Sequence, residues 1–189
     1  GFGEKLLEKL SAEGKKVFLD LKFHDIPNTV ENAARLAKEK NVFMMNFHCL
    51  GGEEMLRAAV RGGGKGPILL GVTVLTSMKG EELKKLGFAG SLEDQVLELA
   101  ELARSSGLDG VVASAQEART LRKKLGEDFC IVTPGIRPEW AAKGDQKRVL
   151  TPKEALDEGA DYIVVGRPII QAKDPLEAAK KILYEMKGE

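Results

Sequence analysis

The feature that most constrains the fold of this chain is a regular alternation of short apolar segments with amphipathic ones. The apolar segments are rich in β-branched residues and nearly continuous, as is typical of strands buried on both faces. They are residues 16–21, 42–49, 67–75, 110–114, 129–135 and 162–166. Buried strands separated by helices indicate a parallel sheet covered by helices on both faces. The alternation therefore predicts an α/β fold.

Helix signals fill the intervals between these segments. Helices are expected to begin near Asn28, Gly52, Ser91, Ala115, Thr151 and Asp174, and a further one, from Phe2 to Ser11, opens the chain. Ser91 is the expected N-cap of a helix that Gly107 stops. Thr151, with Pro152 and Glu154 after it, has the pattern of a capping box. Because no linker or low-complexity segment divides the chain, we predict a single domain over residues 1–189.

Composition excludes several classes of partner. The 29 basic and 29 acidic residues give a net charge of zero, which argues against a broad surface for nucleic acid or an anionic membrane. No apolar run approaches the length of a membrane span, and the first residues lack the apolar core of a secretory signal. Cys49 and Cys130 lie far apart and form no metal-like pair. We expect a soluble cytoplasmic protein.

Polar residues follow almost every predicted strand, and their position favours one kind of α/β fold. They are Asp20, Lys22, His48, Thr76, Ser77, Ser114, Arg137 and Arg167. The carboxyl ends of strands are where a (β/α)₈ (TIM) barrel assembles its active site. Six strands also suit a doubly wound sheet, but the chain opens with a helix, as if a strand preceded it. We therefore predict a TIM (β/α)₈ barrel that is N-terminally incomplete, with only the last six strands evident.

The stretch "LDLKFHD" places charge at the end of the first predicted strand. Asp20 and Lys22 are two residues apart and point to the same side of an extended strand; His24 shares that side, and Asp25 follows the strand. Opposite charges facing a barrel interior are costly unless they hold each other or meet a charged ligand. A structural ion pair, a Schiff base on Lys22 and a divalent metal held by Asp20 and Asp25 are alternatives that spacing alone does not separate.

Two later loops have the composition of a phosphate site. "TPGIR" and "VGRPI" each combine a glycine with an arginine, Arg137 in the first and Arg167 in the second. If the six strands are the last six of eight, these loops follow strands seven and eight, where many barrels bind phosphate. Residues 137–149 between them have the composition of a closing lid, in which Gln146 could donate its amide to a phosphate oxygen.

Three separated blocks of the sequence resemble the bacterial orotidine 5′-phosphate decarboxylase family. They are "DLKFHDIPNT", "VTVLTSM" followed by "LGFAGS", and "TPGIR…GDQKR", and the resemblance extends from the start of the chain to about residue 184. It implies decarboxylation of orotidine 5′-monophosphate to UMP in de novo pyrimidine biosynthesis. It also implies a homodimeric barrel with active sites at the subunit interface and no metal or organic cofactor.

The resemblance assigns roles to residues of this chain. Asp20 matches the aspartate placed against the substrate carboxylate, and Lys22 the lysine that protonates C6 of the pyrimidine. Asp25 matches a catalytic aspartate that reaches the partner's site, and Thr29 a ribose contact from the same segment. The other implied substrate-binding residues are Ile26, Thr76, Ser77, Pro134, Arg137, Gln146, Gly166 and Arg167. His48 is expected to have a packing or hydrogen-bonding role at a strand end.

One departure from the family pattern keeps alternatives open. Family members carry two strands and a helix ahead of the point where this sequence begins, and those strands supply an aspartate and a lysine to the site. Neither residue has a counterpart in this sequence. The alternatives to the decarboxylase are a catalytically impaired remnant that binds UMP, and a related phosphosugar lyase or decarboxylase that uses the Asp-x-Lys-x-x-Asp strand.

Overall fold

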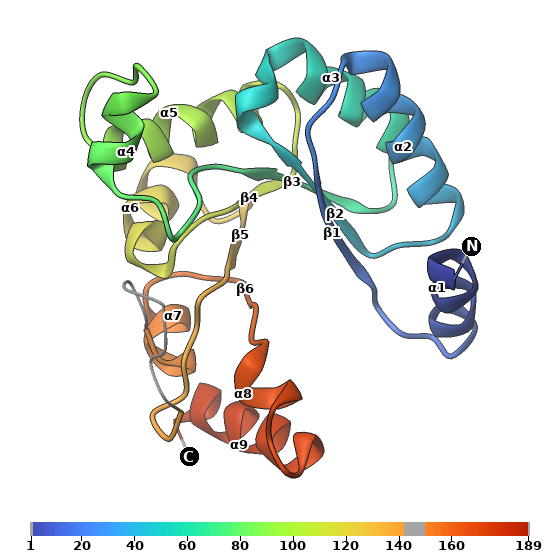
Figure 1. Cartoon of the computed structure of the whole chain (residues 1–189), viewed down its shortest axis with the longest axis vertical. Helices are drawn as coiled ribbons and strands as arrows, with labels where there is room; N and C mark the ends of the chain where they lie inside the picture. Colours follow the sequence, from blue (N-terminus) through green and yellow to red (C-terminus); the bar gives the residue numbers. More distant parts are fainter. Residues whose placement is uncertain (1, 142–149, 189) are drawn as a thin grey trace. The chain divides into compact units, whose positions relative to one another are not determined.

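A computed structural model describes residues 2–141 and 150–188 and confirms the alternation of strands and helices (Figure 1). The strands in the described residues are β1 (Phe18–Phe23), β2 (Met44–His48), β3 (Ile68–Val72), β4 (Gly110–Val112), β5 (Cys130–Thr133) and β6 (Tyr162–Ile163). Each predicted apolar segment contains one strand or most of one. Within these described ranges, no helix combines the length and the apolar character needed to cross a membrane.

The predicted helices also form. They are α1 (Phe2–Ala12), α2 (Pro27–Glu39), α3 (Gly52–Gly63), α5 (Leu92–Ser105), α6 (Ala115–Leu125), α7 (Pro152–Asp157) and α9 (Pro175–Lys187). The sequence reasoning missed α4 (Gly80–Lys85), α8 (Arg167–Ile170) and the 3₁₀ turn η1 (Cys49–Gly51). These elements have six residues or fewer, which is too short for a helical period to show in the sequence.

The predicted helix ends are confirmed by their hydrogen bonds. Ser91 Oγ accepts from the backbone N–H of Asp94 at 3.0 Å, and the Asp94 carboxylate accepts in return from the Ser91 N–H at 3.2 Å. Thr151 and Glu154 form the predicted capping box, with bonds of 3.2 and 2.8 Å. After α5 the chain turns at Gly107, whose φ of +93° lies in the region that favours glycine.

The described chain divides into two compact units, each assembled from two segments. The first unit comprises residues 1–73 and 98–111, and the second comprises residues 74–97 and 112–189. The division falls within α5 and at the end of β4. That the whole chain is a single domain stays a prediction.

The first unit is a parallel sheet with two helices beside it. β2 pairs with β1 and with β3, all in parallel, and the Asp109 N–H, just before β4, donates to the Leu69 carbonyl at 2.9 Å. Helices α2 and α3 pack side by side (Figure 1). Their backbones approach so closely at Gly62 that a Cβ there would lie 2.1 Å from the Glu31 carbonyl oxygen. Met45, Phe47 and Leu70 are buried in the core of this unit, which holds the carboxyl end of β1 in a fixed place.

The second unit contains the β5–β6 pair. The two strands are parallel, with Val132 opposite Tyr162 and Thr133 opposite Ile163. The Ala113 N–H, just after β4, donates to the Val132 carbonyl at 3.1 Å. The core beside these strands is built from Ala115, Ile136, Ala155 and Ala160.

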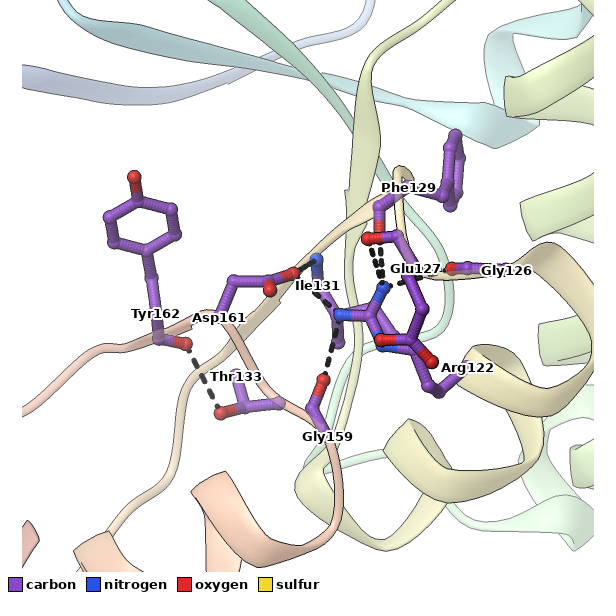
Figure 2. Close-up of polar contacts among 9 residues, drawn as sticks. All are labelled: Arg122, Gly126, Glu127, Phe129, Ile131, Thr133, Gly159, Asp161 and Tyr162. Carbon is purple, nitrogen blue, oxygen red and sulfur yellow. Dashed lines mark hydrogen bonds and ion pairs between the residues drawn. The ribbon is translucent and has the colours of Figure 1, made fainter.

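Arg122, on α6, anchors the amino-terminal ends of β5 and β6 (Figure 2). Its guanidinium donates to the carbonyl oxygens of Gly126, Glu127, Phe129 and Gly159 and to the Asp161 carboxylate, at 2.7–3.0 Å. Asp161 Oδ2 also accepts from the Ile131 N–H at 2.7 Å. The Arg122 side chain is only 12% exposed. Its bonds to Phe129 and Gly159 are partly buried, whereas those to Gly126, Glu127 and Asp161 are exposed. One cation therefore joins the end of α6, the start of β5 and the turn before β6.

Candidate active site

A polar cluster of three side chains lies towards the carboxyl end of β1 and beside it on β2. Lys22 Nζ donates to Asp20 Oδ1 at 2.5 Å, and Asn46 Nδ2 donates to the same oxygen at 2.6 Å. Asn46 Oδ1 accepts from the backbone N–H of Lys22 at 2.8 Å. The structure thus brings Asp20 and Lys22 together, as the sequence predicts, and adds Asn46, which joins both of them.

The backbone at Lys22 is not that of a regular strand. Its φ is +51°, which is uncommon for a residue with a side chain, and the register of β1 on β2 shifts between Leu19 and Phe23. The Asn46 side chain therefore supplies an acceptor for the Lys22 N–H at the point where the ladder is irregular. The prediction that His24 shares one side of the strand with Asp20 and Lys22 assumed a regular extended backbone. Because the backbone is irregular at Lys22, that prediction does not hold for His24. That residue lies beyond β1, with its ring turned towards His48.

Burial divides the cluster into an accessible part and a hidden part. The Lys22 and Asp20 side chains are 38% and 44% exposed, whereas Asn46 is fully buried. The ammonium and the carboxylate are accessible to a ligand, while the amide beneath them fixes where they stand. A buried amide with both of its polar atoms bonded is a stable support, because it leaves no polar group unsatisfied. The arrangement can present a fixed positive charge and an acidic proton beside a fixed negative charge.

Asn46 is the member of the cluster that the sequence reasoning missed. The sequence did indicate Asn46, because it is the one amide side chain in the apolar segment "VFMMNFHC". It also lies two residues before His48, which places the two side chains on the same face of β2. A polar residue inside a fully buried strand requires a partner, and that requirement could have pointed to Asp20 and Lys22 on the neighbouring strand.

His24 and His48 lie beside the cluster with their ring centroids 5.5 Å apart and their planes tilted by 40°. The pKa of His48 is lowered, first by burial and then by the charges of His24 and Lys22. His48 therefore favours the neutral form and adds no positive charge next to Lys22 near neutral pH. The structure places His48 in a ring contact at the strand end, and its functional role stays a prediction.

The segment after β1 carries three further candidates, and all three are exposed. The Asp25 carboxylate accepts from the Ile26 N–H at 2.7 Å. Ile26 is the N-cap of α2 and is 67% exposed, and Thr29 lies in the first turn of that helix. An exposed carboxylate, an exposed aliphatic side chain and a hydroxyl thus stand together at the amino-terminal end of α2. Their assignment to a partner's site stays a prediction.

The remaining candidates belong to the second unit, apart from Gln146. Thr76 and Ser77 form a turn before α4, Pro134 follows β5, and Gly166 and Arg167 stand at the start of α8. Arg137 is buried, and its guanidinium donates to the Ile136 carbonyl at 2.9 Å. Gln146 and most of the predicted lid, residues 142–149, lie outside the described residues. The grouping of these residues around a phosphate stays a prediction.

Over residues 2–141 and 150–188 there is no cluster of three or more His, Cys, Asp or Glu side chains that could hold a metal ion. Neither Cys49 nor Cys130 forms a disulfide within the described residues. Burial raises the pKa of the Cys49 thiol to about 12, so it remains protonated near neutral pH and is a poor nucleophile.

Comparisons with known proteins agree on one family. The model described as "Orotidine 5′-phosphate decarboxylase / HUMPS family" matches residues 1–182. The chain is 56% identical to the orotidine 5′-phosphate decarboxylase of Hydrogenovibrio crunogenus over 183 residues, which cover 95% of this chain and 78% of that protein. It is 52% identical to the one from Saccharophagus degradans over 187 residues, covering 97% of this chain and 79% of that one.

A solved structure supports the same conclusion for the fold. The crystal structure of orotidine 5′-phosphate decarboxylase from Lactobacillus acidophilus is similar with a TM-score of 0.84 and 40% sequence identity, over 97% of this chain and 80% of that one. The similarity, with the parallel strands described above, confirms the predicted fold class, an α/β fold of the (β/α)₈ barrel type with six strands in residues 2–141 and 150–188.

Proposed function

Because the chain belongs to the orotidine 5′-phosphate decarboxylase / HUMPS family, we propose that it removes carbon dioxide from orotidine 5′-monophosphate to give UMP. This is a carboxy-lyase step of pyrimidine biosynthesis. The observation that carries the proposal is the cluster of Asp20, Lys22 and Asn46, in which an accessible ammonium is fixed by a carboxylate and by a buried amide.

Lys22 is the proposed catalytic residue of this reaction. When the bond from C6 to the carboxylate breaks, its electron pair stays on C6, and carbon dioxide leaves. An ammonium placed at C6 stabilises that developing charge and supplies the proton that ends the reaction, so that an N–H bond of Lys22 breaks as C6–H forms. Solvent then reprotonates the amine. The 2.5 Å contact with Asp20 supports this role, because the carboxylate holds the ammonium group in one position.

Asp20 and Asn46 have separate roles in the proposal. Asp20 lies against the substrate carboxylate and holds Lys22, while Asn46 is a positioning residue that bonds to both. The Asn46 amide is fully buried, so its orientation is set by packing rather than by solvent. Preorganisation of this kind lowers the reorganisation that the site must undergo when charge develops on the substrate.

We further propose that two copies of the chain assemble as a homodimer in which Asp25 is a catalytic residue of the partner's site. Ile26 and Thr29 would act with it as substrate contacts. Their common exposure at the start of α2 supports this assignment, and so does the exposed aliphatic side chain of Ile26, which a partner surface would cover.

The phosphate of the substrate is assigned to residues that follow β5 and β6. Pro134 and Arg137 follow β5, and Gly166 and Arg167 follow β6. Thr76 and Ser77 are assigned to the pyrimidine, and Gln146 to the phosphate. Binding energy from the remote phosphate would orient the reacting ring. We also assign the chain to the cytoplasm, with UMP and its precursor as small-molecule partners and neither nucleic acid nor membrane among them.

The direct test is decarboxylation of orotidine 5′-monophosphate, followed by loss of pyrimidine absorbance, by the wild-type chain and by Lys22→Ala. We expect Lys22→Ala to lower kcat by about 10³-fold or more while UMP binding persists. Lys40→Ala is the matched control, because Lys40 bonds to Glu4 and Glu8 rather than to the cluster.

The outcomes separate the proposal from its alternatives. Turnover that survives in Lys22→Ala would exclude Lys22 as the proton donor. A folded wild-type chain that binds UMP without turnover would establish the nucleotide-binding remnant instead. Trapping of Lys22 by borohydride in the presence of a carbonyl substrate would favour the Schiff-base lyase.

A further inference from the structure

The first unit carries an open pocket of about 410 Å³ at the amino-terminal ends of β1, β2 and β3. Four lysines line it. Lys15 and Lys16 precede β1, Lys38 is near the end of α2, and Lys65 precedes β3. Phe43, just before β2, forms part of its wall. We call this feature the basic pocket. It lies at the opposite ends of the strands from the carboxyl end of β1, where Asp20 and Lys22 lie.

The lysines of the basic pocket have no protein counter-ion in the described part of the chain. None of the described residues that line the pocket is acidic, and none of the four lysines forms an ion pair with a carboxylate of residues 2–141 or 150–188. Lys40, two residues after Lys38, behaves differently, because its ammonium contacts Glu4 at 2.7 Å and Glu8 at 2.9 Å. The whole sequence is neutral, so four cations without an anion are a local imbalance of charge. A bound anion would relieve their mutual repulsion.

Two of the ammonium groups have identified neighbours in the basic pocket. Lys16 Nζ lies 4.7 Å from the centroid of the Phe43 ring, over its face, which is a favourable position for a cation. Lys38 Nζ lies against the glycine-rich loop that leads to Lys65, so close that a Cβ on Gly64 would be 2.9 Å from it.

We propose that the basic pocket binds a multivalent phosphate anion, such as pyrophosphate or the phosphate chain of a nucleotide. Four ammonium groups supply more positive charge than a single phosphate needs, and each one is a compact donor suited to phosphate oxygens. The volume falls in the range of pockets for small ligands. The lysines are exposed, so the attraction is screened by salt. The inference does not depend on the proposed decarboxylase, because the pocket shares no residue with the proposed catalytic cluster.

The test is titration of the full chain with pyrophosphate at low salt by calorimetry. The variants are K38Q/K65Q in the pocket, K123Q/K124Q as the control that removes two exposed lysines from α6, and R167Q at the proposed substrate phosphate site. We expect saturable binding by the wild type, by the control and by R167Q. In K38Q/K65Q, the loss of two charge contacts should weaken binding about tenfold or more.

Several results would overturn the inference. These are an absence of saturable binding by the wild type, an unchanged affinity in K38Q/K65Q, or binding that is lost in R167Q alone. A second variant, K15Q/K16Q, should also bind more weakly, which guards against a folding defect in the first. Thermal unfolding should match the wild type for both.

The anion series then defines the ligand. Inorganic phosphate should bind more weakly than pyrophosphate, and equal affinities would contradict the multivalent assignment. If ATP and pyrophosphate bind with equal affinity, the pocket contacts only the phosphate chain of ATP. Tighter binding of ATP would extend the pocket to a nucleotide, and both results support the proposal.

Discussion

Two aspartate–cation pairs in this chain have similar contacts and different surroundings. Lys22 and Asp20 are in contact at 2.5 Å, and Arg122 and Asp161 are in contact at 2.7 Å. The two aspartates are similarly exposed, Asp20 at 44% and Asp161 at 39%, whereas the cations differ, with Lys22 at 38% and Arg122 at 12%. Arg122 also donates to four backbone carbonyls, whereas the Lys22 ammonium donates to Asp20 and keeps donors available for a ligand.

The difference in exposure and bonding matches the different roles of the two ends of the strands in a barrel. Lys22 lies towards the carboxyl end of β1, and Asp161 lies just before the amino end of β6. In barrels of this class, residues at the carboxyl ends of strands serve the reaction, and those at the amino ends serve stability. Arg122 donates its N–H groups to backbone carbonyls, so they are not available to a substrate. An accessible pair contributes little to folding and can bind a ligand. The following experiments test this contrast.

The largest effect on stability is expected from Arg122→Met, compared with Lys22→Met. Arg122→Met removes a donor shared by four carbonyls and Asp161, from a side chain that is only 12% exposed, so the free energy of unfolding should fall by about 2–4 kcal/mol. Lys22→Met should cost less than about 1 kcal/mol, since the pair is half-exposed. Urea unfolding of both variants measures this, and equal losses would remove the distinction between the pairs.

The next effect is expected from Asn46→Leu, which conserves side-chain size and removes the amide. The Lys22 N–H loses its acceptor and Asp20 loses a donor, so unfolding should become easier by about 1–3 kcal/mol. Decarboxylation should fall as well, with kcat more affected than KM, because Lys22 loses its fixed position. Asn32→Leu, at an exposed site on α2, is the control and should change stability by less than about 0.5 kcal/mol. Full activity in Asn46→Leu would refute the positioning role.

A smaller effect should separate two aspartates with the same backbone contacts. Asp161 Oδ2 accepts from the Ile131 N–H at 2.7 Å, and Asp109 Oδ2 accepts from the Leu69 N–H at 2.8 Å. Only Asp161 also meets Arg122 among the described contacts. Asp161→Asn should therefore destabilise the chain by about 1–2 kcal/mol more than Asp109→Asn, since a bond to a charged group is lost. Similar losses, measured by thermal unfolding, would show that Arg122 is held by the carbonyls alone.

The smallest effect concerns pH and His48. Burial, His24 and Lys22 lower the pKa of His48, so the folded chain binds fewer protons than the unfolded chain near the ordinary histidine pKa of about 6.5. The contribution of neutral His48 to the free energy of unfolding is therefore fully present above pH 6.5, and it is lost as the pH falls towards the lowered pKa of His48 in the folded chain. His48→Gln should flatten the decline of unfolding free energy between pH 7.5 and 5.5, and His24→Gln should flatten it less. An unchanged slope in His48→Gln would contradict this.

Much of the fold could be predicted from the sequence because its signals are local. Apolar runs of strand length, a Ser91 cap paired with Asp94 and a stop at Gly107 are set within a few residues, so the strands and the longer helices were found. That Asp20 and Lys22 lie on the same side of one strand was also predicted, since the two are two residues apart, whereas their ion pair was only one of the alternatives left open. The blocks at residues 20–29, at 72–78 with 86–91, and at 133–137 with 144–148 likewise identified the family, now confirmed by its model.

The tertiary structure decided which distant side chains meet. Asn46 is 24 residues from Lys22, and Asp161 is 39 residues from Arg122, so both contacts depend on which strands and turns become neighbours and in what register. The positive φ of Lys22 follows from the irregular pairing of β1 with β2, which no local pattern reports. The basic pocket also collects lysines from three separate segments. Sequence patterns are short-range, whereas the charge and position of a site are set by register and packing between segments.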